Sequence, residues 1–214
     1  MVRKMPVISI EGGDGTGKTT MLEKLKAYLD TKDIDFMVTR EPGGVRIAEL
    51  IREVIHDPDH TEMDPKTEAL LYAAARRQHL VQKVVPAVEE GKLVIFDRYV
   101  DSSMVYQGYV RGLGVEEVYE MNRFATEDFM PDKTLLFDLD PIVGQERIHS
   151  SGVREVNRLD NEGMEFHLKV REGYLKLAKD NAERIALIDA SKSMDHVFND
   201  VKDTIDALLD QWVK

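Results

Sequence analysis

The chain has 214 residues, of which 32% are charged and 43% hydrophobic, and its formal net charge is −11. This length is typical of one soluble α/β domain with a substantial core. The acidic balance argues against a nucleic-acid partner, because binding a polyanion needs clustered Lys and Arg. There is no cysteine, which excludes disulfides, Cys-ligated zinc and thiol catalysis. We see no signal peptide and no membrane-spanning run, so we expect a cytoplasmic protein without a membrane partner.

The first pattern along the chain is a strand, a glycine-rich turn and a helix start. An apolar run at residues 7–10 leads into residues 11–20, EGGDGTGKTT, and leucines follow at helical spacing up to residue 30. The glycines and the helix start predict backbone N–H groups turned toward a phosphate, as in a P-loop. Lys18 supplies charge for the outer phosphates, and the Thr19 hydroxyl is a ligand for Mg²⁺. We therefore predict a nucleoside triphosphate site formed by Gly12, Gly13, Asp14, Gly15, Thr16, Gly17, Lys18, Thr19 and Thr20.

Strands and helices alternate along the rest of the chain. Apolar runs predict strands at residues 6–11, 34–39, 93–96, 134–139 and 185–188, and helical patterns lie at 18–30, 45–55, 64–90, 101–107, 115–129, 164–181 and 195–213. Asp64–Pro65 is a typical helix start, and we expect Pro86 to kink that helix. Residues 141–163 are a polar stretch. The alternation predicts an α/β fold with a five-stranded parallel sheet, helices on both faces and the ligand at the carboxyl ends of the strands.

A second group of candidate residues follows the buried strand pattern at residues 93–96. Asp97 ends that strand, and a carboxylate in this position holds Mg²⁺ directly or through water in P-loop enzymes. The alternative is an Asp that only caps the next turn. Arg98 follows it, and a guanidinium can bridge donor and acceptor phosphates through two hydrogen bonds.

The chain also carries arginines outside the P-loop, namely Arg40, Arg52, Arg76 and Arg77. Together they suggest a second anion, an acceptor that itself bears phosphate, although each alone could be a solvated helix residue. A guanine-reading Asn-Lys-x-Asp motif is absent, which argues against a GTP switch. A motor or transporter ATPase would be longer and would carry a residue that positions water.

Several motifs together resemble those of bacterial-type thymidylate kinases over essentially the whole length. They are EGGDGTGKTT (11–20), TREPGG (39–44), TEALLYAAARR (67–77), DRY (97–99), DSS (101–103), YQG (106–108) and NRLD (157–160). The first is shared by many nucleotide-binding proteins, whereas REPGG with DRY and YQG is specific to this family. The resemblance implies a P-loop nucleoside monophosphate kinase fold, one domain over residues 1–214 with a lid at roughly 144–163, and a homodimer. It also implies transfer of the ATP γ-phosphoryl group to dTMP, with Mg²⁺, for dTTP synthesis.

The resemblance further implies roles for individual residues around dTMP. Tyr72, where most bacterial relatives have Phe, would stack on thymine, and Arg76 and Gln107 would bind the base edge. Arg52 and Arg98 would hold the dTMP phosphate, with Ser102 beside them. Tyr106 would crowd the sugar 2′ position, Asp14 would accept from the 3′-OH, and Glu41 would support the phosphate and Mg²⁺ region.

One position distinguishes the types within this family. Eukaryotic-type members carry an arginine where this chain has Gly15, and the bacterial type supplies that charge from the lid. Arg154 and Arg158 are therefore the candidates for a catalytic lid arginine. Two alternatives stay open: another P-loop kinase of nucleosides or nucleotides, and a non-catalytic nucleotide sensor that signals by lid movement.

Overall fold

The computed structural model describes residues 3–151, 158 and 162–212. Its centre is a parallel sheet of five strands in the order β2-β3-β1-β4-β5. The strands are β1 (Val7–Gly12), β2 (Phe36–Arg40), β3 (Leu93–Asp97), β4 (Lys133–Asp138) and β5 (Ile185–Asp189). Since β1 pairs with both β3 and β4, the P-loop that follows it leaves the sheet at its middle. The predicted fold class and each predicted strand are confirmed, with shifts of one or two residues at the ends.

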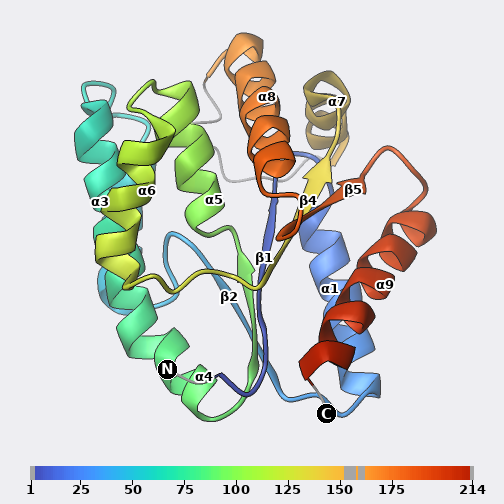
Figure 1. Ribbon diagram of the computed structural model, residues 1–214. Coiled ribbons are helices and arrows are strands. Elements are labelled where there is room, and N and C mark those ends of the chain that lie inside the picture. Colours follow the sequence, from blue (N-terminus) through green and yellow to red (C-terminus); the bar gives the residue numbers. More distant parts are fainter. Residues whose placement is uncertain (1–2, 152–157, 159–161, 213–214) are drawn as a thin grey trace.

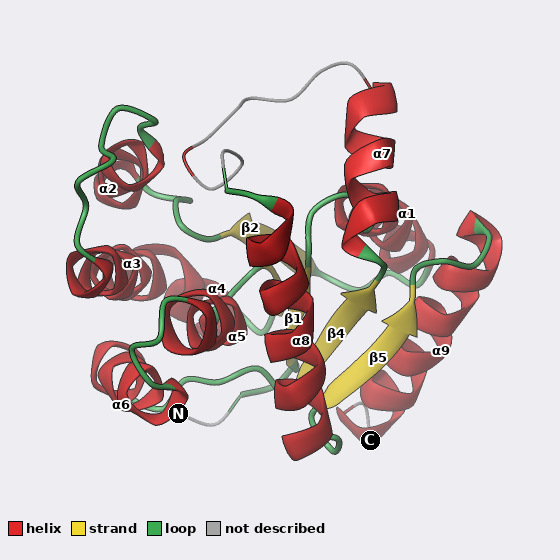
Figure 2. Ribbon diagram, turned by 90° about the horizontal axis from the view of Figure 1, so that it is seen from above, coloured by secondary structure: helices red, strands yellow, loops and turns green. Residues whose placement is uncertain are grey.

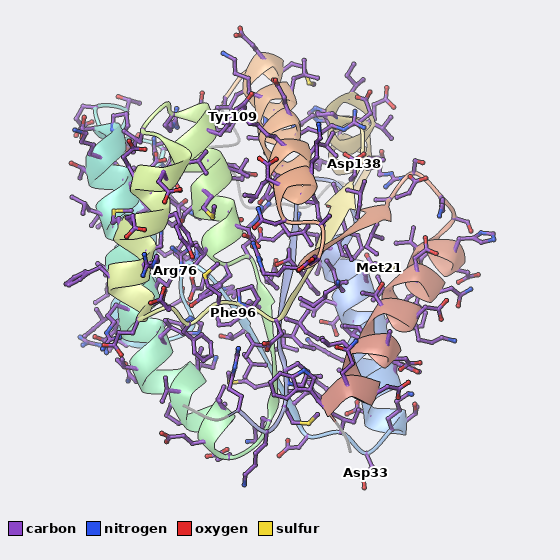
Figure 3. All side chains as sticks on the ribbon, in the orientation of Figure 1. Met21, Asp33, Arg76, Phe96, Tyr109 and Asp138 are labelled. Carbon is purple, nitrogen blue, oxygen red and sulfur yellow. The ribbon has the colours of Figure 1, made fainter. Side chains whose placement is uncertain are left out.

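Helices cover both faces of the sheet, as Figures 1 and 2 show from two directions. One face packs against α1 (Lys18–Thr31) and α9 (Met194–Trp212), and the other against a larger helical layer. The alternation within β3 explains both cores, because Leu93 and Ile95 join the first and Val94 and Phe96 the second. Figure 3 shows Met21 and Arg76 on opposite sides of the sheet. The larger layer contains α3 (Pro65–His79), α4 (Val85–Glu89), α5 (Val100–Ser103), α6 (Val115–Thr126) and α8 (Met164–Asp180).

The helix that begins at Pro65 is irregular before Pro86. Asp64 caps it by accepting hydrogen bonds from the N–H groups of Lys66 and Thr67. A π-helical segment, η1 (Leu80–Val84), lies between α3 and α4, and Pro86 stands in the first turn of α4. Proline has no N–H to donate to the preceding turn, which disturbs the regular hydrogen bonding of an α-helix. The π-helical segment therefore lies next to Pro86, where the sequence predicted a kink. A second π-helical segment, η2 (Met104–Val110), follows α5 and carries Tyr106 and Gln107.

Residues 141–151 correct one expectation from the sequence. We expected a polar stretch without a helix here, but the structure has α7 (Pro141–Ser151). Asp140 begins it, because its carboxylate accepts from the N–H of Ile142 at 2.9 Å. This is the same Asp-Pro start as at Asp64, and it was obscured by Gly144 and the polar residues after it. The proposed lid at 144–163 thus starts inside a helix, and residues 152–157 and 159–161 lie outside the described part.

The remaining element is α2 (Arg46–His56), which packs beside α3. Within the described residues, no helix has the length and apolar character needed to cross a membrane.

Candidate active site

A cavity of about 790 Å³ opens at the carboxyl ends of the strands. Its walls come from the P-loop, the loop after β2, helices α2 and α3, the end of β3, η2, α7, α8 and the segment after β5. Most of the predicted site residues line it. They are Asp14, Gly15, Thr16, Gly17, Lys18, Thr19, Thr20, Glu41, Arg52, Tyr72, Arg76, Asp97, Arg98, Ser102, Tyr106 and Gln107.

The P-loop wraps around the ammonium group of Lys18. The Lys18 Nζ donates hydrogen bonds to the carbonyl oxygens of Gly12, at 3.0 Å, and Gly13, at 2.6 Å. Burial first, and then the charge of Arg98, lower the pKa of Lys18 to about 7. The lysine is therefore held in a half-buried position where the carboxylates of Asp14 and Asp97 only partly balance its charge. An anionic phosphate in the cavity would supply the missing charge.

Gly15 leaves no room for a side chain in this fold. Its φ is 72°, and a Cβ atom there would lie 2.1 Å from the carbonyl oxygen of Gly144 in α7. The reverse contact is equally close, since a Cβ on Gly144 would lie 2.5 Å from the carbonyl oxygen of Asp14. The two backbones touch because both residues are glycine. An arginine at position 15 is thus excluded sterically as well as absent from the sequence.

Arg98 lies between the P-loop and η2. Its φ of 66° is unusual for a residue with a side chain and turns the chain sharply after β3. The guanidinium donates to Asp14 Oδ1 at 3.0 Å and to the Tyr174 hydroxyl at 3.3 Å, and it lies 5.6 Å from the centre of the Tyr106 ring. The structure therefore brings the predicted residues Asp14, Arg98 and Tyr106 together.

Sequence reasoning gave no role to Glu11, which anchors this group. The side chain is fully buried, and its carboxylate accepts from the Ser102 hydroxyl at 2.6 Å, the Tyr174 hydroxyl at 2.9 Å and the Tyr99 N–H at 2.7 Å. Burial, followed by the charge of Asp101, raises the pKa of Glu11. An acidic residue ending an apolar strand was a visible signal. Tyr174 carried none, because it lies 163 residues farther along the chain.

Two of the lining residues, Thr19 and Asp97, offer the oxygen ligands that Mg²⁺ prefers. Asp97 ends β3 directly opposite Ile10, so its carboxylate lies beside the strand that feeds the P-loop. Across the described residues there is no cluster of three or more His, Asp or Glu side chains that could hold a metal by themselves. A hydroxyl and a carboxylate fit a cation that keeps several water or phosphate oxygens, as Mg²⁺ does with nucleotides.

Arg76 is held by a buried network on the larger helical side of the sheet. Its side chain is 2% exposed, and its Nε donates to Glu41 Oε2 at 2.7 Å. Its other donors reach Asn122, Ser103 and the carbonyl oxygen of Tyr99. Glu41 was expected to support the phosphate and metal region, and it lines the cavity, but its carboxylate is occupied by Arg76 and His79.

His79 completes this network and is fully buried. Its Nδ1 lies 2.8 Å from Glu41 Oε1, and its Nε2 lies 2.7 Å from the Thr39 hydroxyl. Asn122 of α6 was not singled out from the sequence, since nothing in the pattern of that helix separates it from an ordinary polar position.

The far end of the cavity contains Tyr72, His56 and Arg52. The Tyr72 hydroxyl lies 3.3 Å from Nε2 of His56. Burial, and next the charge of Arg52, lower the pKa of His56 to about 3, so this imidazole is neutral at pH 7. Arg52 donates to the carbonyl oxygen of Pro42 at 3.2 Å. His56 was not predicted from the sequence.

Of the two candidate lid arginines, only Arg158 lies within the described part of the chain. Arg154 lies outside the described residues. Arg158 contacts the helices beside the cavity, where its Nε donates to the carbonyl oxygen of Ile55 at 3.1 Å and its Nη2 contacts Glu68. In this arrangement Arg158 is not among the residues that line the cavity. A different arginine, Arg147 of α7, lines the cavity and donates to the carbonyl oxygen of Ala190 at 3.2 Å.

Comparison with known proteins agrees with this geometry. The family model described as thymidylate kinase matches residues 10–201. The thymidylate kinase of Geobacillus sp. (strain WCH70) is 57% identical over 203 residues, covering 95% of both chains. That of Clostridium novyi (strain NT) is 51% identical, covering 94% of this chain and 98% of its own. The crystal structure of thymidylate kinase from Ehrlichia chaffeensis has a TM-score of 0.74 at 30% identity, covering 94% and 98%. The chain therefore belongs to the thymidylate kinase family of nucleoside monophosphate kinases.

Proposed function

We propose that this protein transfers the γ-phosphoryl group of ATP to dTMP, giving ADP and dTDP for dTTP synthesis in the cytoplasm. The observation that carries this proposal is the continuity of one cavity, which runs from the P-loop past Arg98 to Tyr72, Arg76 and Gln107. A triphosphate site at one end and an aromatic, hydrogen-bonding pocket at the other are what two nucleotides need in order to meet. Residues 1–214 would form a single kinase domain.

The reaction needs no general base. A phosphomonoester has a second pKa near 6, so the attacking oxygen of dTMP is already mostly ionised at pH 7. The difficulty is to bring two anions together in line, which is a matter of positioning and charge neutralisation. Lys18 and the P-loop N–H groups would hold the ATP phosphates. Arg98 would bridge the transferring and acceptor phosphates, and Arg52 would hold the acceptor phosphate.

Mg²⁺, when bound, would screen the phosphate charges and fix the geometry of the γ-phosphoryl group. Thr19 and Asp97 would hold it, Asp97 directly or through water. Tyr72 would stack on the thymine, and Arg76 and Gln107 would bind its edge. Asp14 would accept from the 3′-OH of the sugar, and Tyr106 would disfavour a 2′-OH. Ser102 would keep Arg98 in place, and Glu41 would keep Arg76 in place.

A lid at roughly 144–163 would close over the nucleotides and bring an arginine to the transferring phosphate. The close contact of Gly15 with Gly144 supports this proposal, because the P-loop has no space for an arginine of its own. Arg154 and Arg158 are the candidates. If Arg158 is the catalytic one, it has to leave its contacts with Glu68 and Ile55 when the lid closes.

We also propose a homodimer formed through α3 and α6. The argument is that these neighbouring helices and the adjoining η1 expose apolar side chains: Phe124 of α6 is 89% exposed, Leu70 of α3 59% and Val81 of η1 43%. Isolated exposed apolar residues are ordinary, but several on two packed helices favour a second copy of the same chain. Light scattering at micromolar concentration should give about twice the 24.4 kDa mass of one chain. A mass of one chain would contradict this proposal.

One assay separates the proposed reaction from its alternatives. ADP release is coupled to a spectroscopic signal and measured with ATP and Mg²⁺, with and without dTMP. We expect release that depends on dTMP and is much slower with thymidine. A nucleotide sensor would show no dependence on dTMP, and a nucleoside kinase would prefer thymidine, which has no phosphate for Arg52 to bind.

A further inference from the structure

A buried carboxylate, Glu68 of α3, lies behind the base end of the cavity without lining it. The residue is 1% exposed. Its Oε1 accepts a hydrogen bond from the amide nitrogen of Gln107 at 2.8 Å, and its Oε2 contacts Nη2 of Arg158. The Nε of Arg111 lies 3.6 Å from the same Oε1. Three donors therefore converge on one carboxylate, two from η2 and its C-terminal end and one from Arg158.

This contact determines which way the Gln107 amide is turned. A carboxylate between guanidinium groups only accepts hydrogen bonds, so the group that Gln107 presents to it must be the NH₂. The opposite orientation would bring two oxygen acceptors together in a buried place, which costs about 1–3 kcal/mol. Gln107 lines the cavity, and among the described residues its Oε1 has no hydrogen-bond partner. The amide is therefore left with an acceptor to offer to a ligand.

We propose that Glu68 is a positioning residue that determines base specificity by holding the Gln107 amide with its oxygen toward the base. This inference rests on the proposed function, in which Gln107 binds the edge of thymine. Thymine has an N3–H donor and cytosine has an N3 acceptor in the same place. The Gln107 amide oxygen would accept a hydrogen bond from the N3–H of thymine and would repel the N3 lone pair of cytosine. A site built to accept from a substrate N–H discriminates strongly against an analogue without it.

The test compares dTMP with 5-methyl-dCMP, which has the same size and the same 5-methyl group. The two differ only at N3 and at the 4-position. Wild type, Glu68→Gln, Gln107→Ala and the double variant are each measured for kcat/KM with both nucleotides. Glu68→Gln keeps the side-chain volume but replaces one acceptor by a donor, so that the Gln107 amide is free to turn over. Since each ratio is taken on one preparation, partial loss of folded protein cancels.

We expect Glu68→Gln to lower the preference for dTMP over 5-methyl-dCMP by about tenfold, within the range for one buried hydrogen bond. Gln107→Ala should lower it at least as much. In the Gln107→Ala background, adding Glu68→Gln should change the ratio by less than about twofold, because a residue that acts through another has no effect once that other is removed. If Glu68 had a purely structural role, Glu68→Gln would lower kcat/KM equally for both nucleotides and leave their ratio unchanged.

The inference is overturned if Glu68→Gln keeps the wild-type ratio, if Gln107→Ala does not change it, or if Glu68→Gln has the same effect in both backgrounds. Dissociation constants for the same two nucleotides, measured by calorimetry, give the ratio independently of turnover. If the proposed reaction is wrong, the wild-type protein will show no ADP release that depends on dTMP. Failure of this inference would appear only in the comparison between variants.

Discussion

The two ends of the cavity are stabilised in opposite ways. At the base end, Arg76 is joined to Glu41 and Asn122 in a buried network in which opposite charges already face each other. At the phosphate end, the Lys18 ammonium is held by the carbonyl oxygens of Gly12 and Gly13, and its pKa is lowered to about 7. The Arg76 network at the base end is therefore paired without a ligand, whereas the positive charge of Lys18 at the phosphate end is only partly balanced by the carboxylates around it.

This difference indicates where selectivity and catalysis reside. A preorganised pocket chooses the base by the fixed directions of its donors and acceptors, and folding has already ordered these groups. An incompletely neutralised phosphate site interacts most strongly with the species that carries the most negative charge. Mutations at the base end should therefore affect folding as well as binding, and mutations at the phosphate end mainly turnover.

The largest expected effect is on stability at the base end. Glu41→Ala leaves Arg76 buried with no carboxylate, and breaking a buried ion pair in this way costs about 3–5 kcal/mol. Urea denaturation should show a loss of this size. Glu165→Ala is the control, because Glu165 pairs with Lys169 on an exposed helix surface and its removal should lower stability far less. Equal losses in the two variants would contradict a special contribution of the buried Glu41–Arg76 pair to stability.

Next in size is Lys18→Ala at the phosphate end. We expect turnover to fall by about 10²-fold or more, the ~3 kcal/mol typical of a lost preorganised charge, while the protein stays folded. The unfolding midpoint and kcat measured on one preparation test both parts of this expectation. A variant with near-normal turnover would contradict the P-loop assignment. A variant that no longer folds would mean that the phosphate end of the cavity, like the base end, is needed for the stability of the fold.

For the lid arginine, the loss of turnover that would still support a catalytic role is smaller. Replacing the correct one of Arg154 and Arg158 by Ala should lower kcat by more than tenfold, over about 1.4 kcal/mol, with little change in dTMP affinity. An arginine on a transferring phosphate is worth ~10³–10⁵ in related reactions. Lysine should rescue only part, because it lacks the planar guanidinium. If both Ala variants turn over within tenfold of wild type, Arg98 acts without a lid arginine.

The last prediction concerns pH and His56. Its pKa is about 3 in the folded protein and about 6.5 when unfolded. The unfolded chain therefore binds more protons between these values, and stability falls as pH falls below 6.5, by at most about 1.4 kcal/mol per unit. His56→Gln should show a flatter decline between pH 6.5 and 4 when denaturation curves of the two proteins are compared. Parallel curves would show that His56 is not held neutral by the fold.

Local sequence patterns determined a large part of this protein. Apolar runs gave each strand to within one or two residues, and the spacing from Gly12 to Thr19 predicted the P-loop. Asp64–Pro65 predicted where α3 begins. These signals work because hydrogen bonding, side-chain periodicity and capping depend on residues a few positions apart. The same reasoning should have found α7 at Asp140–Pro141, but a glycine and polar residues hid its periodicity.

The tertiary structure alone decided which side chains serve the site from a distance. Tyr174 reaches Glu11 across 163 positions, Asn122 reaches Arg76 from another helix, and Glu68 turns the Gln107 amide. It also excluded a side chain at Gly15, because α7 packs its Gly144 against that residue. No spacing rule encodes such pairs. Two buried polar groups become partners only when the packing of the whole core removes water from both, and each then needs the other.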